Sequence, residues 1–174
     1  MAAIDPAAAR RFRKGEEGQL LSLMRGLARF EGYIDDFAVT TRDIVDAGLS
    51  YPPQFYGYVV PDRKSGTLLG MAITYIIPWT FSGKPHLVLK ELYVDDPARG
   101  FGVGQRLMKA VLAQAHEIGA FRVQWTVLAR NERAKAFYSR LGAQHDAQWE
   151  DWEIRLSDSV PAEPLPGMVE GALK

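Results

Sequence analysis

The sequence contains no cysteine among its 174 residues and only three histidines. The absence of cysteine excludes disulfide bonds, thiolate catalysis and sulfur-ligated zinc. His86, His116 and His145 lack the close spacing typical of metal ligands. We therefore expect a reaction that needs no metal.

The sequence also lacks an excess charge of either sign and any long apolar run. Lys and Arg together number 21, as do Asp and Glu, so no net field favours nucleic acid or an anionic membrane. No apolar stretch reaches the length of a bilayer span, and residues 1–13 lack the apolar core of a secretory signal. We expect a cytoplasmic protein that binds neither nucleic acid nor membrane.

Hydrophobic residues make up 47% of the chain, which is enough for one continuous core. We expect a single domain over residues 1–156. Residues 157–174 contain Pro and Glu without hydrophobic periodicity, and this composition predicts a mobile tail.

Hydrophobic periodicity predicts a mixture of helices and strands, hence an α/β (α+β) fold. The predicted helices cover residues 18–30, about 41–48, 105–118 and 133–141. The predicted strands cover residues 10–13, 55–60, 68–77, 87–94, 121–127, 144–148 and 152–156.

A glycine-rich segment, Arg99-Gly100-Phe101-Gly102-Val103-Gly104, directly follows a predicted strand and opens the helix at Gln105. Glycines let the backbone turn tightly and approach a ligand, and amides at the start of a helix attract anions. The segment therefore fits a diphosphate, to which Arg99 can add a charge. The alternative is a connection with packing duties only. The spacing matches neither the dinucleotide fingerprint nor a Walker loop.

Arg99, Gly102 and Gly104 have the R-x-x-G-x-G spacing, which resembles the diphosphate-binding motif of GNAT acetyltransferases. A second segment is similar to the helix that supports the far arm of CoA in that family. Its matching residues are Asn131, Ala134, Phe137, Tyr138, Leu141, Gly142 and Ala143. The resemblance runs from about Phe12 to Leu156 and is greatest to the spermidine/spermine (diamine) N-acetyltransferase-like branch.

The resemblance implies a GNAT fold, in which about four helices flank a mixed, mostly antiparallel sheet of six to seven strands. This sheet is splayed between its fourth and fifth strands, beside a β-bulge on the fourth strand, where backbone groups bind the pantetheine arm like an added strand. It also implies acetyl-CoA as cosubstrate and transfer to a primary amine of a small molecule. The implied CoA-binding residues are Leu92, Tyr93, Val94, Arg99, Gly100, Phe101, Gly102, Val103, Gly104, Gln105, Asn131, Ala134 and Phe137.

Two residues are candidates for the catalytic steps. An amine attacks a thioester only in its neutral form, and the leaving thiolate benefits from a proton donor. Tyr138 occupies the position of the family's general acid, although a Tyr that only packs beside Phe137 is the structural alternative. Glu91 is the candidate base. Strand alternation sends Lys90 and Glu91 to opposite faces, so we expect only one of them to face the cleft.

The acceptor amine is less well defined by the sequence. Polyamine-acetylating relatives have carboxylates where this chain has Ile77 and Lys90, and the lost charges disfavour a polyamine. Lys90 suits a substrate with a carboxylate beside its amine, such as an amino acid. The candidate substrate-binding residues are Phe30, Glu31, Trp79, Lys90, Trp125 and Glu150. Each has an alternative role, as a solvated charge or a core aromatic.

Two other functions stay open at this point. A non-catalytic acyl-CoA-binding module would have no need of an acid at Tyr138. An acetyltransferase of protein N-termini or lysines would have a shallow cleft instead of one closed by the 79–86 loop. Trp149 and Trp152 resemble the dimer-forming part of diamine acetyltransferases, which implies a homodimer; in the alternative, a monomer, both tryptophans pack internally.

Overall fold

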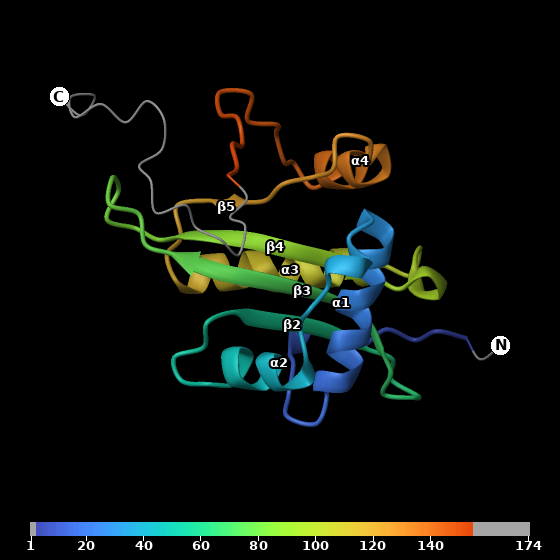
Figure 1. Ribbon diagram of the computed structural model, residues 1–174. Coiled ribbons are helices and arrows are strands. Elements are labelled where there is room, and N and C mark those ends of the chain that lie inside the picture. Colours follow the sequence, from blue (N-terminus) through green and yellow to red (C-terminus); the bar gives the residue numbers. More distant parts are fainter. Residues whose placement is uncertain (1–2, 155–174) are drawn as a thin grey trace. The chain divides into compact units, whose positions relative to one another are not determined.

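The computed structural model describes residues 3–154, which form two compact units that divide after Asn131 (Figure 1). The first unit is built on one sheet, with the strand order β1-β2-β3-β4-β5. Strands β1 to β4 pair antiparallel, and β5 pairs parallel with β4. The strands are β1 (Arg10–Arg11), β2 (Tyr56–Pro61), β3 (Leu68–Ile77), β4 (His86–Val94) and β5 (Val123–Gln124).

Three α-helices of the first unit cover the sheet, α1 and α2 on one face and α3 on the other (Figure 1). They are α1 (Glu17–Glu31), α2 (Thr41–Gly48) and α3 (Val103–Glu117), and two short 3₁₀ helices cover Ile34–Asp36 and Asp96–Ala98. Thr40 caps α2: its hydroxyl accepts a hydrogen bond from the amide of Asp43, whose carboxylate accepts from the Thr40 amide. Leu20 of α1, Ile44 of α2 and Met71 of β3 lie in the core between the sheet and these two helices.

Gly70 of β3 brings the start of α3 close to the sheet. A Cβ at this position would lie 2.7 Å from the Tyr93 carbonyl oxygen and 2.9 Å from Val103 Cγ1. Both distances are shorter than van der Waals contact. The first turn of α3 can therefore pack on the middle strands only because residue 70 has no side chain.

Strand β4 contains a β-bulge. Ile73 pairs with Glu91 and Thr74 with Leu89, so Lys90 is the extra residue without a partner on β3. On its other side, β4 pairs with β5 only at Leu87 and Val88. Within residues 3–154 the sheet is thus open from the bulge to the end of β4.

The mixed, mostly antiparallel sheet confirms the predicted fold class, but it has five strands where six to seven were expected. The strand predicted at 121–127 is only Val123–Gln124, and residues 144–148 form no strand. Those five residues are all exposed, so no apolar face drives them to join a sheet. Residues 152–154 are not a strand either, and the rest of the predicted strand and the predicted tail lie outside the described residues.

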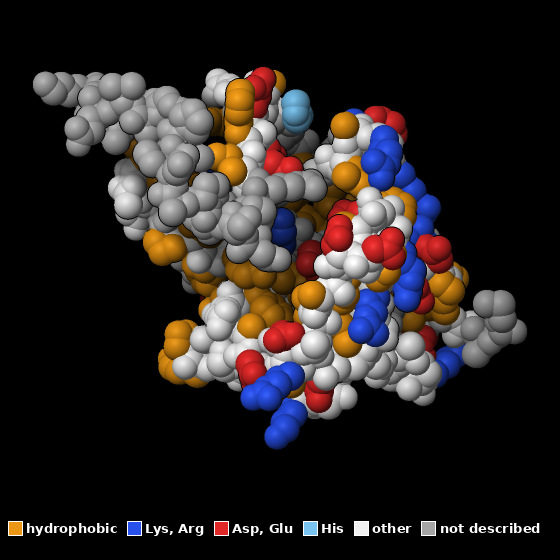
Figure 2. All heavy atoms as spheres, in the orientation of Figure 1, with side chains coloured by type: hydrophobic (Ala, Val, Ile, Leu, Met, Phe, Trp, Pro, Cys, Tyr) orange, Lys and Arg blue, Asp and Glu red, His pale blue; other side chains and the backbone are white. Residues whose placement is uncertain are grey.

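The second unit contains α4 (Glu132–Arg140), one residue earlier at both ends than predicted. No helix in the described part of the chain is long and apolar enough to cross a membrane. Acidic and basic side chains are interspersed on the face shown in Figure 2.

Candidate active site

The glycine-rich segment forms a turn that exposes the start of α3. Gly100 and Gly102 have φ angles of +88° and +77°, in the left-handed region that favours glycine. Gly102 caps α3, and its carbonyl accepts from the Arg106 amide. The backbone amides of Val103, Gly104 and Gln105 donate no hydrogen bond to any acceptor within residues 3–154. Three donors at the positive end of a 15-residue helix fit a diphosphate, as the sequence predicts.

Arg99 connects this turn to the end of β4. Its Nε donates a 3.1 Å hydrogen bond to the Val94 carbonyl, and its guanidinium forms an ion pair with Asp96. The guanidinium carbon also lies 5.7 Å from the centre of the Phe30 ring and 5.8 Å from that of Tyr93. Arg99 therefore stabilises the turn, while the predicted contact with a phosphate stays a prediction.

The bulge places the Glu91 side chain on the α1 face of the sheet. Glu91 lies opposite Ile73, which belongs to the core beneath α1 and α2, and directly paired residues share a face. The extra residue at Lys90 breaks the strand alternation from which the faces of Lys90 and Glu91 were predicted. That only one of them faces the cleft stays a prediction. Lys90 is exposed, and its charge acts on both Glu31 and Glu91.

Glu91 is half-buried, and its carboxyl has an unusually high pKa. Burial and, to a lesser degree, the Glu31 carboxylate raise its pKa to about 7, against the opposing charge of Lys90. Its Oε2 atom is buried and has no hydrogen-bond partner among the described residues. A carboxyl of this pKa can accept a proton near neutral pH.

The end of α1 brings two more groups near Glu91. Gly32, with a φ of +94°, ends the helix, and the amides of Gly32 and Tyr33 both donate to the Ala28 carbonyl. Burial raises the pKa of Glu31, opposed by Lys90 and Arg130. Burial, Glu91 and Glu31 together raise the pKa of Tyr33 to about 12. Two carboxylates and a neutral phenol therefore lie near one another.

A sequence model of the Acetyltransferase (GNAT) family matches residues 22–143, more than half of the chain. The chain belongs to this family. It is an N-acetyltransferase, as the sequence resemblance implied.

Curated relatives and solved structures that match this chain include acetyltransferases. The chain is 28% identical to the thialysine N-epsilon-acetyltransferase of Bos taurus over 164 residues, which cover 91% of this chain and 96% of the relative. It is 26% identical to the spermidine/spermine N(1)-acetyltransferase-like protein 1 of Homo sapiens over 145 residues, 80% of this chain and 21% of that protein. The crystal structure of a probable acetyltransferase superposes with a TM-score of 0.74 at 21% identity, covering 88% of this chain and all of the other.

Trp79 lies in an aromatic cluster at the far end of the sheet from the glycine turn. Its ring packs edge-on against His86 at 4.9 Å and Phe121 at 5.3 Å between ring centres, and the Arg122 guanidinium lies 4.3 Å from its centre. These contacts fix Trp79 at the start of β4. Trp125 is half-buried. Whether either ring contacts a substrate stays a prediction.

The remaining predicted residues belong to the second unit or to its border. The backbone amide of Asn131 donates a hydrogen bond to the Leu128 carbonyl. On α4, the rings of Phe137 and Tyr138 meet edge-on at 5.2 Å and both side chains are half-buried, as is Ala134. Glu150 is exposed, and so are Trp149 (73%) and Trp152 (88%), so internal packing of both tryptophans is not observed.

Sequence reasoning missed two residues that act on the carboxyls of Glu91 and Glu31, and one buried polar residue of α3. Tyr75 and Arg130 interact electrostatically with Glu91 and Glu31, respectively, but neither belongs to a motif. Gln114 could have been noticed, because a polar residue on the apolar face of a predicted helix is unusual.

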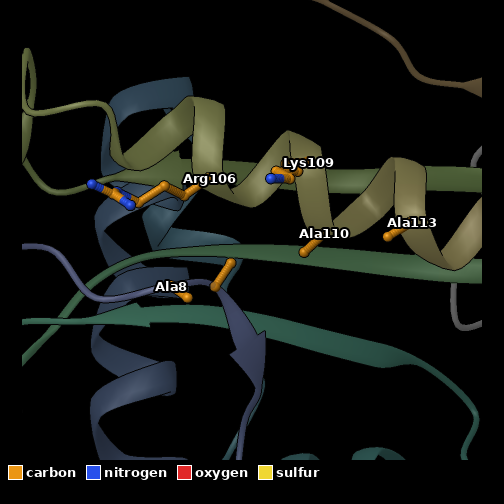
Figure 3. A pocket seen from close by; sticks show the side chains of 6 residues that line it. Ala8, Arg106, Lys109, Ala110 and Ala113 are labelled. Atoms are coloured by element: carbon orange, nitrogen blue, oxygen red, sulfur yellow. The ribbon is translucent and has the colours of Figure 1, made fainter.

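A shallow pocket of about 300 Å³ lies elsewhere, between the N-terminal segment and the outer side of α3 (Figure 3). Its lining residues are Ala8, Ala9, Arg106, Lys109, Ala110 and Ala113. None of them is a predicted site residue.

Proposed function

We propose that this protein transfers the acetyl group of acetyl-CoA to the primary amine of a small molecule that also carries a carboxylate. Transfer occurs by direct attack in a ternary complex. The proposal is supported by the order of features along β4. The bulge comes first, then the Glu91 carboxyl, the open sheet edge and the glycine turn. A donor site for a diphosphate and a basic carboxyl thus belong to one strand and the turn after it.

Glu91 is the general base in this proposal. Acetyl-CoA supplies a thioester, which only the neutral amine attacks. With a pKa of about 7, Glu91 is ionised in about half of the molecules at neutral pH and can accept the ammonium proton, directly or through a water molecule. Its Oε2 atom has no hydrogen-bond partner in the described part of the chain and so leaves an acceptor for that proton.

The other steps are assigned to backbone groups and to one phenol. The amides at the start of α3 bind the diphosphate, and the open edge of β4 at Leu92, Tyr93 and Val94 binds the pantetheine arm. The Val94 carbonyl already accepts a hydrogen bond from Arg99. The other backbone groups of this edge therefore form the hydrogen bonds with the pantetheine arm. Tyr138 donates a proton to the sulfur as the thiolate leaves.

The charges around Glu91 favour an amino-acid-like substrate over a polyamine. Lys90 is exposed at the bulge, and no ion pair occupies its ammonium within the described residues. It can therefore bind a carboxylate, while Glu31 holds the substrate amine. Thialysine, in the name of the bovine relative, is an amino acid.

A thiol-release assay with acetyl-CoA tests both levels of this proposal. The acceptor panel consists of amino acids with side-chain amines, polyamines, and peptides with a free N-terminus or lysine. We expect release with the amino acids, and we expect Lys90→Glu to lower their kcat/KM by about tenfold or more, since a charged contact is lost and a repulsive one gained. Equal amino-acid activity in Lys90→Glu would contradict the substrate class. No release with any acceptor would favour an acyl-CoA-binding module.

A further inference from the structure

A buried polar pair links the helix of the glycine turn to the strand beside the bulge. Thr74 of β3 is fully buried, Gln114 of α3 is 4% exposed, and the Thr74 hydroxyl donates a 2.7 Å hydrogen bond to Gln114 Oε1. Their neighbours are apolar and buried: Leu89 pairs with Thr74 in the sheet, and Val111 and Ala115 lie on α3 beside Gln114. Buried polar side chains in such a layer need a reason beyond packing.

The pair lies at the point where the register of the sheet changes. The shift between β3 and β4 falls between Ile73 and Thr74: Thr74 still faces Leu89, whereas Ile73 faces Glu91. Gln114 Nε2 is buried and has no hydrogen-bond partner among residues 3–154. Gln114 is thus bonded to the residue at which the register of β3 and β4 shifts, and a bulge leaves backbone groups outside the regular ladder.

Without the bulge, the Glu91 side chain would change face. A regular ladder continued from the Thr74–Leu89 pair would place Glu91 opposite Ala72. Ala72 alternates with Gly70 and Thr74 on the face packed against α3, where Gly70 meets Val103 and Leu107. A slip of one residue therefore moves the carboxyl from the α1 face, near Glu31, into the apolar layer under α3.

We propose that Thr74 and Gln114 are positioning residues whose hydrogen bond fixes the register shift and so keeps Glu91 on the α1 face of the sheet. The same bond ties α3, whose first turn carries the free amides, to the strand opposite the bulge. The effect of this arrangement on catalysis rests on the proposed function. The effect of the hydrogen bond on the strand register is independent of that function.

Hydrogen exchange at the bulge tests the proposal without any substrate. In Thr74→Val and Gln114→Leu we expect the amides of residues 89–91 to exchange about tenfold faster relative to those of β2, the factor that follows from loss of one buried hydrogen bond. Thr74→Ser keeps the hydroxyl and should exchange like the wild type. Ile44→Val on α2 is the control, because it truncates a fully buried side chain far along the sequence from the bulge.

Kinetics then separate positioning from a purely structural role. In the same two variants, kcat for amine acetylation should fall about tenfold or more, since small displacements of a catalytic group are costly, while KM for acetyl-CoA stays near the wild-type value. Thr74→Ser should restore kcat. Exchange that rises equally over the whole sheet, as in Ile44→Val, would overturn the proposal. A wild type without acetylation would overturn the proposed function alone, because the exchange result would still decide the role of the pair.

Discussion

At the scale of single residues, Glu91 links the candidate chemistry to stability. Its folded-state pKa of about 7 lies above the ordinary value of 4.5. Between these two pH values, the folded protein holds a proton that the unfolded chain releases. The free energy of unfolding should therefore fall as the pH rises through this range, by about 1–3 kcal/mol after allowance for partial exposure.

Glu91→Gln should remove this part of the pH dependence. Urea unfolding of the wild type and of Glu91→Gln at pH 4.5 and pH 8 measures the difference. Glu117→Gln, at the exposed end of α3, is the matched control and should behave like the wild type. The same pH dependence in wild type and Glu91→Gln would mean that the carboxyl is not buried in the folded protein.

Tyr138 separates an enzyme from a binding module. We expect Tyr138→Phe to lower kcat by about 10²–10⁴-fold, the usual loss on removal of a general acid. The dissociation constant of CoA, measured by calorimetry, should stay nearly unchanged, because the phenol oxygen has no assigned role in binding. Tyr51→Phe, which alters a 99% exposed ring, controls for the loss of a hydroxyl. Unaltered kcat in Tyr138→Phe would remove this residue from the mechanism.

At the scale of elements, Gly70 controls where α3 begins. Gly70→Ala places a methyl group against the Tyr93 carbonyl and Val103, so the start of α3 must move away from the sheet. We expect a loss of about 1–3 kcal/mol in the free energy of unfolding and weaker binding of CoA by calorimetry. Gly18→Ala on α1, where a Cβ meets nothing within 4 Å, should not weaken CoA binding. Wild-type affinity in Gly70→Ala would show that the position of this first turn does not matter.

The elements also show how far the sequence could predict the fold. Strand β3 was predicted at its observed bounds and α2 within a residue, because their apolar patterns and the cap at Thr40 are local signals. Family resemblance implied a bulge on the fourth strand but not its position at Lys90. A register shift depends on two strands and leaves no mark in the sequence of one of them. For this reason strand alternation alone could not place the side chains of Lys90 and Glu91.

At the scale of the whole molecule, we propose that the protein is a homodimer. Trp149 and Trp152 are 73% and 88% exposed, and contact with a second copy of the chain would cover this apolar surface. Light scattering after gel filtration should give twice the 19.4 kDa mass of the chain. Replacement of both tryptophans by Ala should shift the protein toward the single-chain mass. A monomer at all concentrations would contradict the proposal.

The acid limb of the pH–rate profile tests the central claim, that Glu91 is the base of an acetyl-CoA-dependent amine acetyltransferase. With both substrates saturating, kcat of the wild type should rise with pH and reach half of its maximum near pH 7, where Glu91 loses its proton. Glu91→Gln should lack this limb and be about 10²–10⁴-fold slower at pH 8, while Glu117→Gln keeps the wild-type profile. A wild-type profile in Glu91→Gln would contradict the account.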